Sequence, residues 1–322
     1  MKKTLLKTAV CLMAAIVAPT ALAAEKFPER PVTLIVPNSP GGAVDILARL
    51  LSDKLQKIWE KPVVIIYKSG AGTVLGTDYV AKAHKDGYTL GMVVTSHVIN
   101  PSLRSKLPYD TEKDLAGVSL LASSQIIITA SPELGAKTLP EVIALAKKKP
   151  GELTYASPGS GSSMHLGGEL LKSEAGIQML HIPFKGSGPA YPEVMSGRVS
   201  LLIDPLFSSL PHIKSGRLVP IALMRNVRDP SVPGVGTVGD VLKGFDVQSI
   251  FGVVAPRGTP QPIIDKISAD FAKVLSTPEM KERLDQIGMA PIGSTAQEFD
   301  SYIHTEIKKW ATVVKTSGAT AD

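Results

Sequence analysis

Short apolar runs and longer amphipathic stretches alternate along the first part of the chain. Residues 32–36, 63–67 and 89–94 are apolar runs bounded by turn residues, which predicts three strands. Residues 44–58 place Val and Leu at helical spacing on one face, and residues 76–83 are a second predicted helix. Strands that alternate with amphipathic helices are typical of α/β proteins. We therefore predict an α/β fold with a mostly parallel sheet.

The same alternation restarts in the middle of the chain and ends in a helical C-terminus. A chain of 322 residues is also long enough for about two domains. The predicted strands here are 126–130, 153–156, 179–182, 199–204, 218–223 and 249–255, and the predicted helices are 139–148, 163–174, 189–196, 261–275, 278–287 and 296–317.

A weak internal repeat links the two halves. The segment VPNSPGGAVDILARLL begins at Val36, and YASPGSGSSMHLGGELL begins at Tyr155, roughly 120 residues later. Each runs from a strand through a Ser-Pro-Gly turn into a helix with a Leu-Leu pair. We infer that each half contributes one equivalent turn. Residues 39–42 are called the first turn below, and residues 157–161 the second turn.

Both turns have the chemistry of an anion site. A helix N-terminus presents unpaired backbone N–H groups and about half a positive charge, and glycine lets a ligand approach the backbone closely. Hydroxyl donors could come from Ser39, Ser96, Ser162 and Ser163. Two such turns across a cleft would hold both ends of a dicarboxylate, or one carboxylate and a second polar group. The alternative is that each turn is only a tight loop.

The sequence lacks the usual nucleotide, hydrolase and metal motifs. There is no G-x-x-x-x-G-K-[ST], and Met164 stands where G-x-G-x-x-G would need its third glycine. Ser162 and His165 lie close together, but the G-x-S-x-G of a nucleophile elbow is not met. The six histidines show no H-E-x-x-H or comparable metal spacing. We expect no cofactor, no metal and no catalysis, and keep an exported α/β hydrolase as the rival interpretation.

Four side chains near predicted strand ends are candidates for the site. Asp45 either complements its helix dipole or holds the first turn in shape from behind. His165 either contacts the ligand or caps and packs its helix. Asp204 either points into the cleft or caps the residues that follow its strand. Phe207 is a candidate side wall of the pocket, at the sheet end where open α/β folds bind ligands.

The N-terminus has the pattern of a secretory signal peptide, predicted to span residues 1–23. Three lysines precede an apolar stretch over residues 9–18, and Ala21-Leu22-Ala23 supplies a small-x-small cleavage pattern. A membrane anchor is the alternative, but the stretch is shorter than the roughly 20 residues of a spanning helix. Cleavage after Ala23 would remove the only cysteine, Cys11, and lower the formal net charge of +6 by three. We predict an exported chain without a disulfide and without a nucleic-acid surface.

Seven ordered segments carry a family resemblance: FPERPVTLIVP, PGGAVDILARLL, GAGTVLGTDYVAKAHKDGYTL, LPYDTEKDLAGVSLL, YASPGSGSSMHLGGELL, HIPFKGSGPAYPEVMSGRV and GVVAPRGTPQPIIDKI. Together they resemble the periplasmic substrate-binding proteins of tripartite tricarboxylate transporters, the Bug or TctC family. The resemblance covers residues 27–317, nearly all of the predicted mature chain.

This resemblance implies a two-lobed periplasmic-binding-protein clamshell of type II. It implies that lobe 1 comprises residues 24–124 and 249–322 and lobe 2 residues 125–248, with crossings near residues 122–125 and 247–250. It also implies that backbone N–H groups, hydroxyls and water from the two turns hold the ligand carboxylates. With Phe207 added, the expected ligand-binding residues are Asn38, Ser39, Pro40, Gly41, Gly42, Asp45, Thr95, Ser96, His97, Ser157, Gly159, Gly161, Ser162, Ser163, His165, Lys185, Gly186 and Asp204.

The chain departs from the family pattern at two places. The family often has an aromatic residue where Asn38 stands, and Asn-x-Pro-Gly-Ala-Gly where residues 67–72 are YKSGAG. Asn38 removes an apolar wall and adds an amide that can donate and accept hydrogen bonds. We therefore predict a ligand with a polar group beyond its first carboxylate.

The sequence thus predicts a periplasmic receptor, expected to be a monomer, that captures a small organic acid (an aliphatic or aromatic carboxylate) and closes around it. The resemblance implies that the closed form is presented to membrane transporter subunits. A receptor that serves a sensor kinase is a second rival, because either partner could recognise the same closed lobes.

Overall fold

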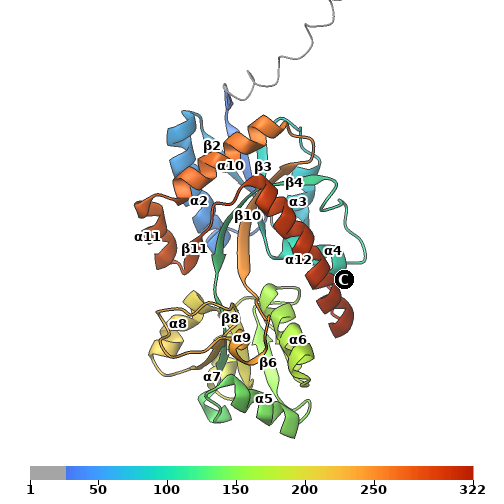
Figure 1. Ribbon diagram of the computed structural model, residues 1–322, viewed down its shortest axis with the longest axis vertical. Coiled ribbons are helices and arrows are strands. Elements are labelled where there is room, and N and C mark those ends of the chain that lie inside the picture. The colour runs from blue at the N-terminus through green and yellow to red at the C-terminus, as the bar shows by residue number, and fades with distance from the viewer. Residues whose placement is uncertain (1–26, 322) are drawn as a thin grey trace, which may run out of the picture.

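The computed structural model describes residues 27–321, so the predicted signal peptide and Cys11 lie outside the described residues. Two β-sheets, each with its own helices, lie one beyond the other along the long axis of the molecule (Figure 1). Sheet A has six strands in the order β11-β4-β10-β3-β1-β2, and sheet B has five in the order β7-β6-β8-β5-β9. Sheet A consists of β1 (Val32–Val36), β2 (Val63–Tyr67), β3 (Thr89–Val94), β4 (Leu115–Ser124), β10 (Ser249–Pro256) and β11 (Met289–Pro291), and sheet B of β5 (Ile126–Ala130), β6 (Thr154–Ser157), β7 (Leu180–Pro183), β8 (Leu201–Pro205) and β9 (Val219–Leu223).

Both sheets are mixed, so the prediction of a mostly parallel sheet is wrong. In sheet A, β1 pairs in parallel with β2 and β3, whereas β10 is antiparallel to β3 and β4, and β11 is antiparallel to β4. In sheet B, β6 pairs in parallel with β7 and β8, whereas β5 is antiparallel to β8 and β9. Antiparallel pairs arise because β4 leads the chain out of sheet A and β10 leads it back, in opposite directions and side by side. The α/β class itself is confirmed.

Helix α2 shows how a helix of the sheet A region buries one apolar stripe. In α2, Leu47, Leu51 and Leu55 recur at helical spacing and are buried, while Arg49 between them is exposed. Each such Leu stabilises the fold by about 1.5–3 kcal/mol relative to exposure. Helix α12 begins with a capping box between Thr295 and Glu298. The helices are α2 (Ala43–Trp59), α3 (Val74–Ala81), α4 (Ser96–Leu103), α10 (Gln261–Leu275), α11 (Pro278–Gln286) and α12 (Ala296–Ser317), with the 3₁₀ turn η1 (Ala71–Thr73) before α3.

Sheet B carries shorter helices and a second part of the core. Tyr155 on β6 is fully buried, and its hydroxyl donates to Glu169 Oε1 at 2.6 Å. Its ring lies against Gly168, where an added Cβ would come within 2.5 Å of it. The helices are α5 (Leu139–Lys148), α6 (Ser163–Ala175), α7 (Ala190–Met195), α8 (Leu206–Lys214) and α9 (Val238–Val241), and the 3₁₀ turn η2 is Pro132–Leu134.

The chain passes between the two sheets twice, at the same level. β4 ends at Ser124 and β5 begins at Ile126, and β10 begins at Ser249, which pairs with Ser124. Strands β4 and β10 therefore lie side by side where they point toward sheet B (Figure 1). The predicted lobe boundaries, residues 24–124 with 249–322 and residues 125–248, stay a proposal.

Five helices and strands were not predicted: β4, β11, α4, α8 and α9. Helices α4 and α8 contain an internal proline, Pro101 and Pro211, and proline inside a periodic stretch predicts a break. Helix α9 has only four residues. β4 mixes Gly and Ser with its apolar residues and is buried along nearly its whole length, so it lacks a polar face that would mark a strand. β11 has only three residues.

Candidate functional site

A cavity of about 440 Å³ lies between the two sheets, where their strands end and several helices begin. Its wall contains eight of the predicted site residues: Asn38, Thr95, Ser96, Gly159, Gly161, Ser162, Ser163 and Phe207. Two more wall residues, Pro158 and Ser160, belong to the predicted second turn, and ten were not predicted: Ala43, Gly72, Thr73, Val94, Ser124, Met164, Pro205, Ser249, Ile250 and Phe251.

Five helices direct their first residues at this cavity. Ala43 begins α2, Thr73 precedes α3, Ser96 begins α4, Ser163 begins α6, and Phe207 is the second residue of α8. Each helix start brings unpaired N–H groups and partial positive charge. The described wall residues include no Lys, Arg or His. An anion here would therefore be held by backbone dipoles and not by a basic side chain.

Hydroxyl groups complete the polar part of the wall. Thr73 Oγ1 and Ser96 Oγ share a hydrogen bond of 2.8 Å, and Ser163 Oγ lies 3.2 Å from Ser249 Oγ. Since Ser163 begins α6 and Ser249 begins β10, the second pair connects the two sheets. A hydroxyl both donates and accepts, so these groups can rotate to donate to a carboxylate.

Two polar atoms of the wall are buried without a partner in the described part of the chain. They are the side-chain oxygen of Asn38 and the hydroxyl oxygen of Ser124, and both residues line the cavity. A buried polar atom without a hydrogen bond costs about 1–3 kcal/mol. A ligand group that bonds to these atoms would recover that free energy.

The first turn is held from behind by Asp45. The Gly41 N–H donates to Asp45 Oδ2 at 2.8 Å, and Arg49 Nε and the Tyr67 hydroxyl donate to Oδ1 at 2.8 and 2.5 Å. Burial raises the pKa of the Asp45 carboxyl, but these hydrogen bonds outweigh burial and leave its pKa below the usual range. The carboxylate is therefore ionised, and both of its oxygens already accept hydrogen bonds within the protein. Ser39, Pro40, Gly41 and Gly42 are exposed and lie outside the cavity wall.

The second turn is held from behind by His165. The Gly161 N–H donates to His165 Nδ1 at 3.1 Å, and the His165 ring stacks on His181 with centroids 3.9 Å apart. His181 Nε2 lies 2.7 Å from Ser157 Oγ, which accepts the Gly159 N–H at 3.3 Å. His165 and Ser157 are thus buried supports of the turn and are not part of the cavity wall.

Three other predicted contacts lie away from the cavity. His97 is 1% exposed, because α4 begins at Ser96 and the next side chain turns about 100° into the core. Asp204 is fully buried and accepts from Ser187, Tyr191 and Ser209. Lys185 is exposed outside the wall.

The remaining predicted residue, Gly186, supports the second turn through the backbone. Its N–H donates to the Pro158 carbonyl oxygen at 2.9 Å, and the Phe184 N–H donates to the Ser157 carbonyl oxygen at 3.0 Å. The loop after β7 is therefore attached to the second turn, while Gly186 itself is not part of the cavity wall.

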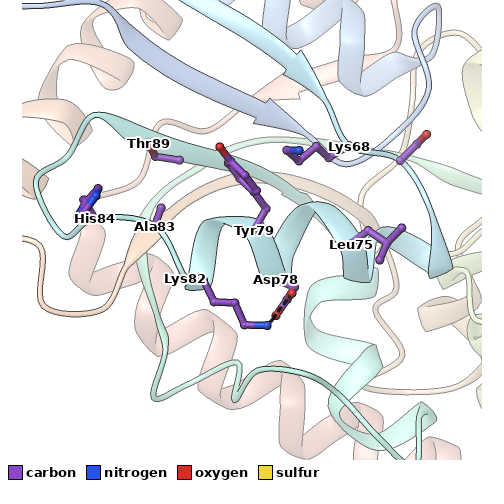
Figure 2. A pocket seen from close by; sticks show the side chains of 9 residues that line it. Lys68, Leu75, Asp78, Tyr79, Lys82, Ala83, His84 and Thr89 are labelled. Carbon is purple, nitrogen blue, oxygen red and sulfur yellow. Dashed lines mark hydrogen bonds and ion pairs between the residues drawn. The ribbon is translucent and has the colours of Figure 1, made fainter.

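A second hollow, of about 540 Å³, lies on α3 and the end of β2 (Figure 2). Lys68 Nζ sits 4.2 Å from the Tyr79 ring centroid, and Lys82 is 2.7 Å from Asp78. Figure 2 shows these side chains along one face of α3 and its neighbouring loops. Its walls come from the region of sheet A alone and include none of the predicted site residues. We therefore place the candidate site in the cavity between the sheets.

Some of the wall residues that were not predicted do lie in a recognisable sequence pattern. Gly72 and Thr73 belong to a third glycine-rich turn between a strand and a helix, the same pattern as the other two turns. Ser124 and Ser249 had no such signal, because nothing in the sequence pairs two distant serines across adjacent strands. Within residues 27–321, no helix is long and apolar enough to cross a membrane, and no group of three or more His, Cys, Asp or Glu could hold a metal ion.

Solved structures show the class of protein that this fold defines, the two-lobed periplasmic binding proteins. A protein from R. palustris solved with adipate is 32% identical, with a TM-score of 0.79 over 91% of this chain and 99% of that chain. MatC from Rhodopseudomonas palustris with bound malate is 31% identical, with a TM-score of 0.75 over 89% of this chain and 100% of that chain.

Sequence comparison names the family. Residues 47–319 match the model of the tripartite tricarboxylate transporter family receptor. The chain is also 35% identical over 301 residues to Protein BugT of Bordetella pertussis, with 92% of each chain covered. The chain belongs to the tripartite tricarboxylate transporter receptor family, a family of periplasmic binding proteins, and this confirms the resemblance.

Proposed function

We propose that this protein is an exported receptor that captures a small organic dicarboxylate between its two lobes and delivers it to a tripartite tricarboxylate-type transporter. One observation carries the proposal: a cavity between the sheets is surrounded by five helix starts and has no basic side chain in its described wall. Such a wall suits a compact anion. The adipate and malate in the two solved relatives support a dicarboxylate.

The unpartnered oxygens narrow the ligand class. The Asn38 side-chain oxygen is an acceptor, so it fits a ligand group that donates a hydrogen bond. The Ser124 hydroxyl can serve a second polar group of the same ligand. We infer a dicarboxylate that carries a hydroxyl group, similar to malate, in preference to a plain alkyl diacid.

Direct contact with the ligand is assigned to the eight predicted residues of the wall, with Thr73, Ser124 and Ser249 added. Asp45, Ser157, His165, Gly186 and Asp204 act as supports behind the wall, on the contacts described above. The first-turn residues 39–42 reach the ligand when the lobes close. Closure must come from tighter binding to the closed state.

The hydrogen bonds of Ser162 argue against the rival interpretation of the protein as a hydrolase. Its hydroxyl donates to the Gly159 carbonyl oxygen at 2.7 Å and accepts the His165 N–H at 3.2 Å, which caps α6. His165 Nδ1 is occupied by Gly161 and not by this hydroxyl. A nucleophile needs a base that takes its proton, and that pair is not formed here.

A thermal-shift and calorimetry screen tests the proposal. The protein without its signal segment is titrated with malate, adipate, succinate and the monoamide of succinate. We expect a dicarboxylate at about 100 times its Kd to stabilise the fold by about 2.7 kcal/mol, and the monoamide to bind more weakly. Binding of monoacids only, or of none of these acids, would contradict the proposal. Uptake of labelled ligand by cells with and without the receptor distinguishes transport from a sensor-kinase role.

A further inference from the structure

The hydrogen bond behind the second turn depends on the protonation state of one side chain. Because the Gly161 N–H donates to His165 Nδ1, that nitrogen cannot carry a proton. Gly161 has a φ of +78°, and an added Cβ would lie 2.6 Å from Leu103 Cδ2 on α4. The glycine is therefore held between the His165 ring and a helix of sheet A, with little room to move.

The surroundings of the His165 ring oppose a positive charge. The residue is 7% exposed and its ring stacks on His181, so two imidazolium rings would face each other at 3.9 Å. Glu169, one turn along α6, is already bonded to Lys172 Nζ at 2.7 Å and to the Tyr155 hydroxyl. Burial lowers the pKa of His165, with Lys172 lowering it further and Glu169 raising it. His181, Glu169, Lys172 and Tyr155 are the titratable groups that contact or influence the ring in the described chain.

We propose that His165 is a positioning residue whose neutral ring fixes the second turn and whose protonation releases it. A protonated ring has a hydrogen on Nδ1, which would then face the Gly161 N–H across 3.1 Å, donor against donor. This hydrogen bond is then lost, the ring and the glycine must separate, and the start of α6 is no longer presented to the cavity in the same shape. The consequence for ligand binding rests on the proposed function: affinity falls as pH falls through the pKa of His165, below the usual histidine range.

The first turn supplies an internal control. Asp45 accepts from Gly41 at the same offset of four residues, but its acceptor is a carboxylate whose pKa is below the usual range. That carboxylate stays ionised throughout the range in which a histidine titrates. The geometry therefore predicts one turn that responds to mild acid and one that does not, within the same molecule.

Amide NMR of the unliganded, ¹⁵N-labelled protein tests the positioning role directly. On lowering the pH from about 7.5 to about 4.5, a range that spans histidine titration, the Gly161 amide signal should shift together with the His165 ring nitrogens. The Gly41 amide should stay in place. In His165→Asn, the side-chain oxygen can accept the same N–H and does not titrate, so the Gly161 signal should not move. A Gly161 signal that is flat in the wild type, or that moves equally in His165→Asn, overturns the proposal.

Calorimetry with malate as the probe tests the consequence for binding. We expect wild-type affinity to fall by about tenfold more than that of His165→Asn over the same pH range, the fold-change of one net hydrogen bond. Protonation of malate affects both proteins equally, so it cancels in the comparison. Identical pH profiles for the two proteins would overturn this consequence. If wild-type protein binds neither malate nor adipate near neutral pH, the proposed function fails, while the NMR titration still decides the role of His165.

Discussion

The two turns are held by the same kind of hydrogen bond, but the accepting side chains differ in charge. In each, a glycine N–H is accepted by a side chain four residues later: Gly41 by Asp45 and Gly161 by His165. The acceptor in the first turn is charged and balanced by Arg49, whereas the acceptor in the second turn is neutral. A neutral support leaves the positive end of the α6 dipole uncompensated toward the cavity. If the proposed function holds, we expect the second turn to bind an anion more strongly than the first at neutral pH.

The turns also differ in how tightly they are packed. Gly161 is buried against Leu103 and lines the cavity, whereas Gly41 is exposed and an added Cβ would meet nothing within 4 Å. The second turn is therefore fixed in place by both halves of the molecule. The first turn is fixed by Asp45 of its own helix, which in turn accepts a hydrogen bond from Tyr67.

The largest expected effect comes from adding a methyl group at each glycine. Gly161→Ala places a side chain at a left-handed φ and against Leu103, and we expect it to lower the free energy of unfolding by about 3 kcal/mol. Gly41→Ala also places a side chain at a left-handed φ but meets no neighbouring atoms, so we expect it to lower the free energy of unfolding by about 1 kcal/mol. Urea unfolding of both variants measures the difference. Equal losses would mean that the packing difference between the turns has no energetic weight.

A second comparison is between two buried histidines, His97 and His165. The His165 ring accepts a hydrogen bond from Gly161, and the His97 ring has none within residues 27–321. His97 is fully buried, neither ring nitrogen has a partner in the described chain, and burial lowers its pKa to about 4. Because the unfolded chain binds this proton more readily than the folded one, stability is fully present above about pH 6.5 and is lost as pH falls toward about 4. At about pH 4.5 the loss from His97 is about 2–3 kcal/mol.

The variant His97→Leu isolates this effect. It should change the free energy of unfolding little near neutral pH, because no hydrogen bond of His97 is removed. Near pH 4.5 it should be more stable than the wild type by about 2 kcal/mol, since the titrating group is gone. Urea titrations at both pH values measure the two differences. If the wild type and His97→Leu lose the same stability as pH falls, His97 does not cause the acid sensitivity.

A smaller effect is expected at Asn38, which contributes polarity to the first-turn side of the cavity. Asn38→Leu keeps a similar volume and removes the unpartnered oxygen. We expect the affinity for malate to fall by about tenfold and the affinity for adipate to change less, because only malate has a hydroxyl to donate. Calorimetry with both acids measures the two affinities. Equal losses for both would show that Asn38 acts by shape and not by hydrogen bonding.

The smallest effect is expected at Lys185, an exposed cation directly before Gly186, whose N–H donates to the second turn. Because it does not line the cavity, Lys185→Ala should change the free energy of unfolding and the ligand affinity by less than about 0.5 kcal/mol. Calorimetry and urea unfolding check both quantities. A large loss of affinity would mean that the anion is held by a side-chain charge after all.

The sequence predicted the position of the candidate site along the chain more accurately than it predicted which side chains face the cavity. Ser-Pro-Gly turns before amphipathic helices are local patterns, so both turns could be placed on the chain and assigned to an anion. The direction of a side chain depends on the residue at which its helix begins. Since α4 was not predicted, Ser96 and His97 were treated alike, although one faces the cavity and the other the core.

Local sequence patterns could not predict the order of strands in the sheets or the position of the serines on the crossing strands. Hydrophobic periodicity predicts a strand but not its neighbour, so the antiparallel entry of β10 between β3 and β4 could not be derived from it. Ser124 and Ser249 meet only because of that pairing. By contrast, Asp45 as a support behind the first turn was one of two interpretations that its position in the sequence allowed.

Native mass spectrometry of the protein released from the periplasm, without refolding, tests the central claim most directly. We expect a fraction of the protein to retain one small dicarboxylate, and added malate to fill the remainder with one molecule per chain. We also expect Gly161→Ala to retain less of this acid than Gly41→Ala. Protein that carries no acid and takes up none of the dicarboxylates offered would contradict the account.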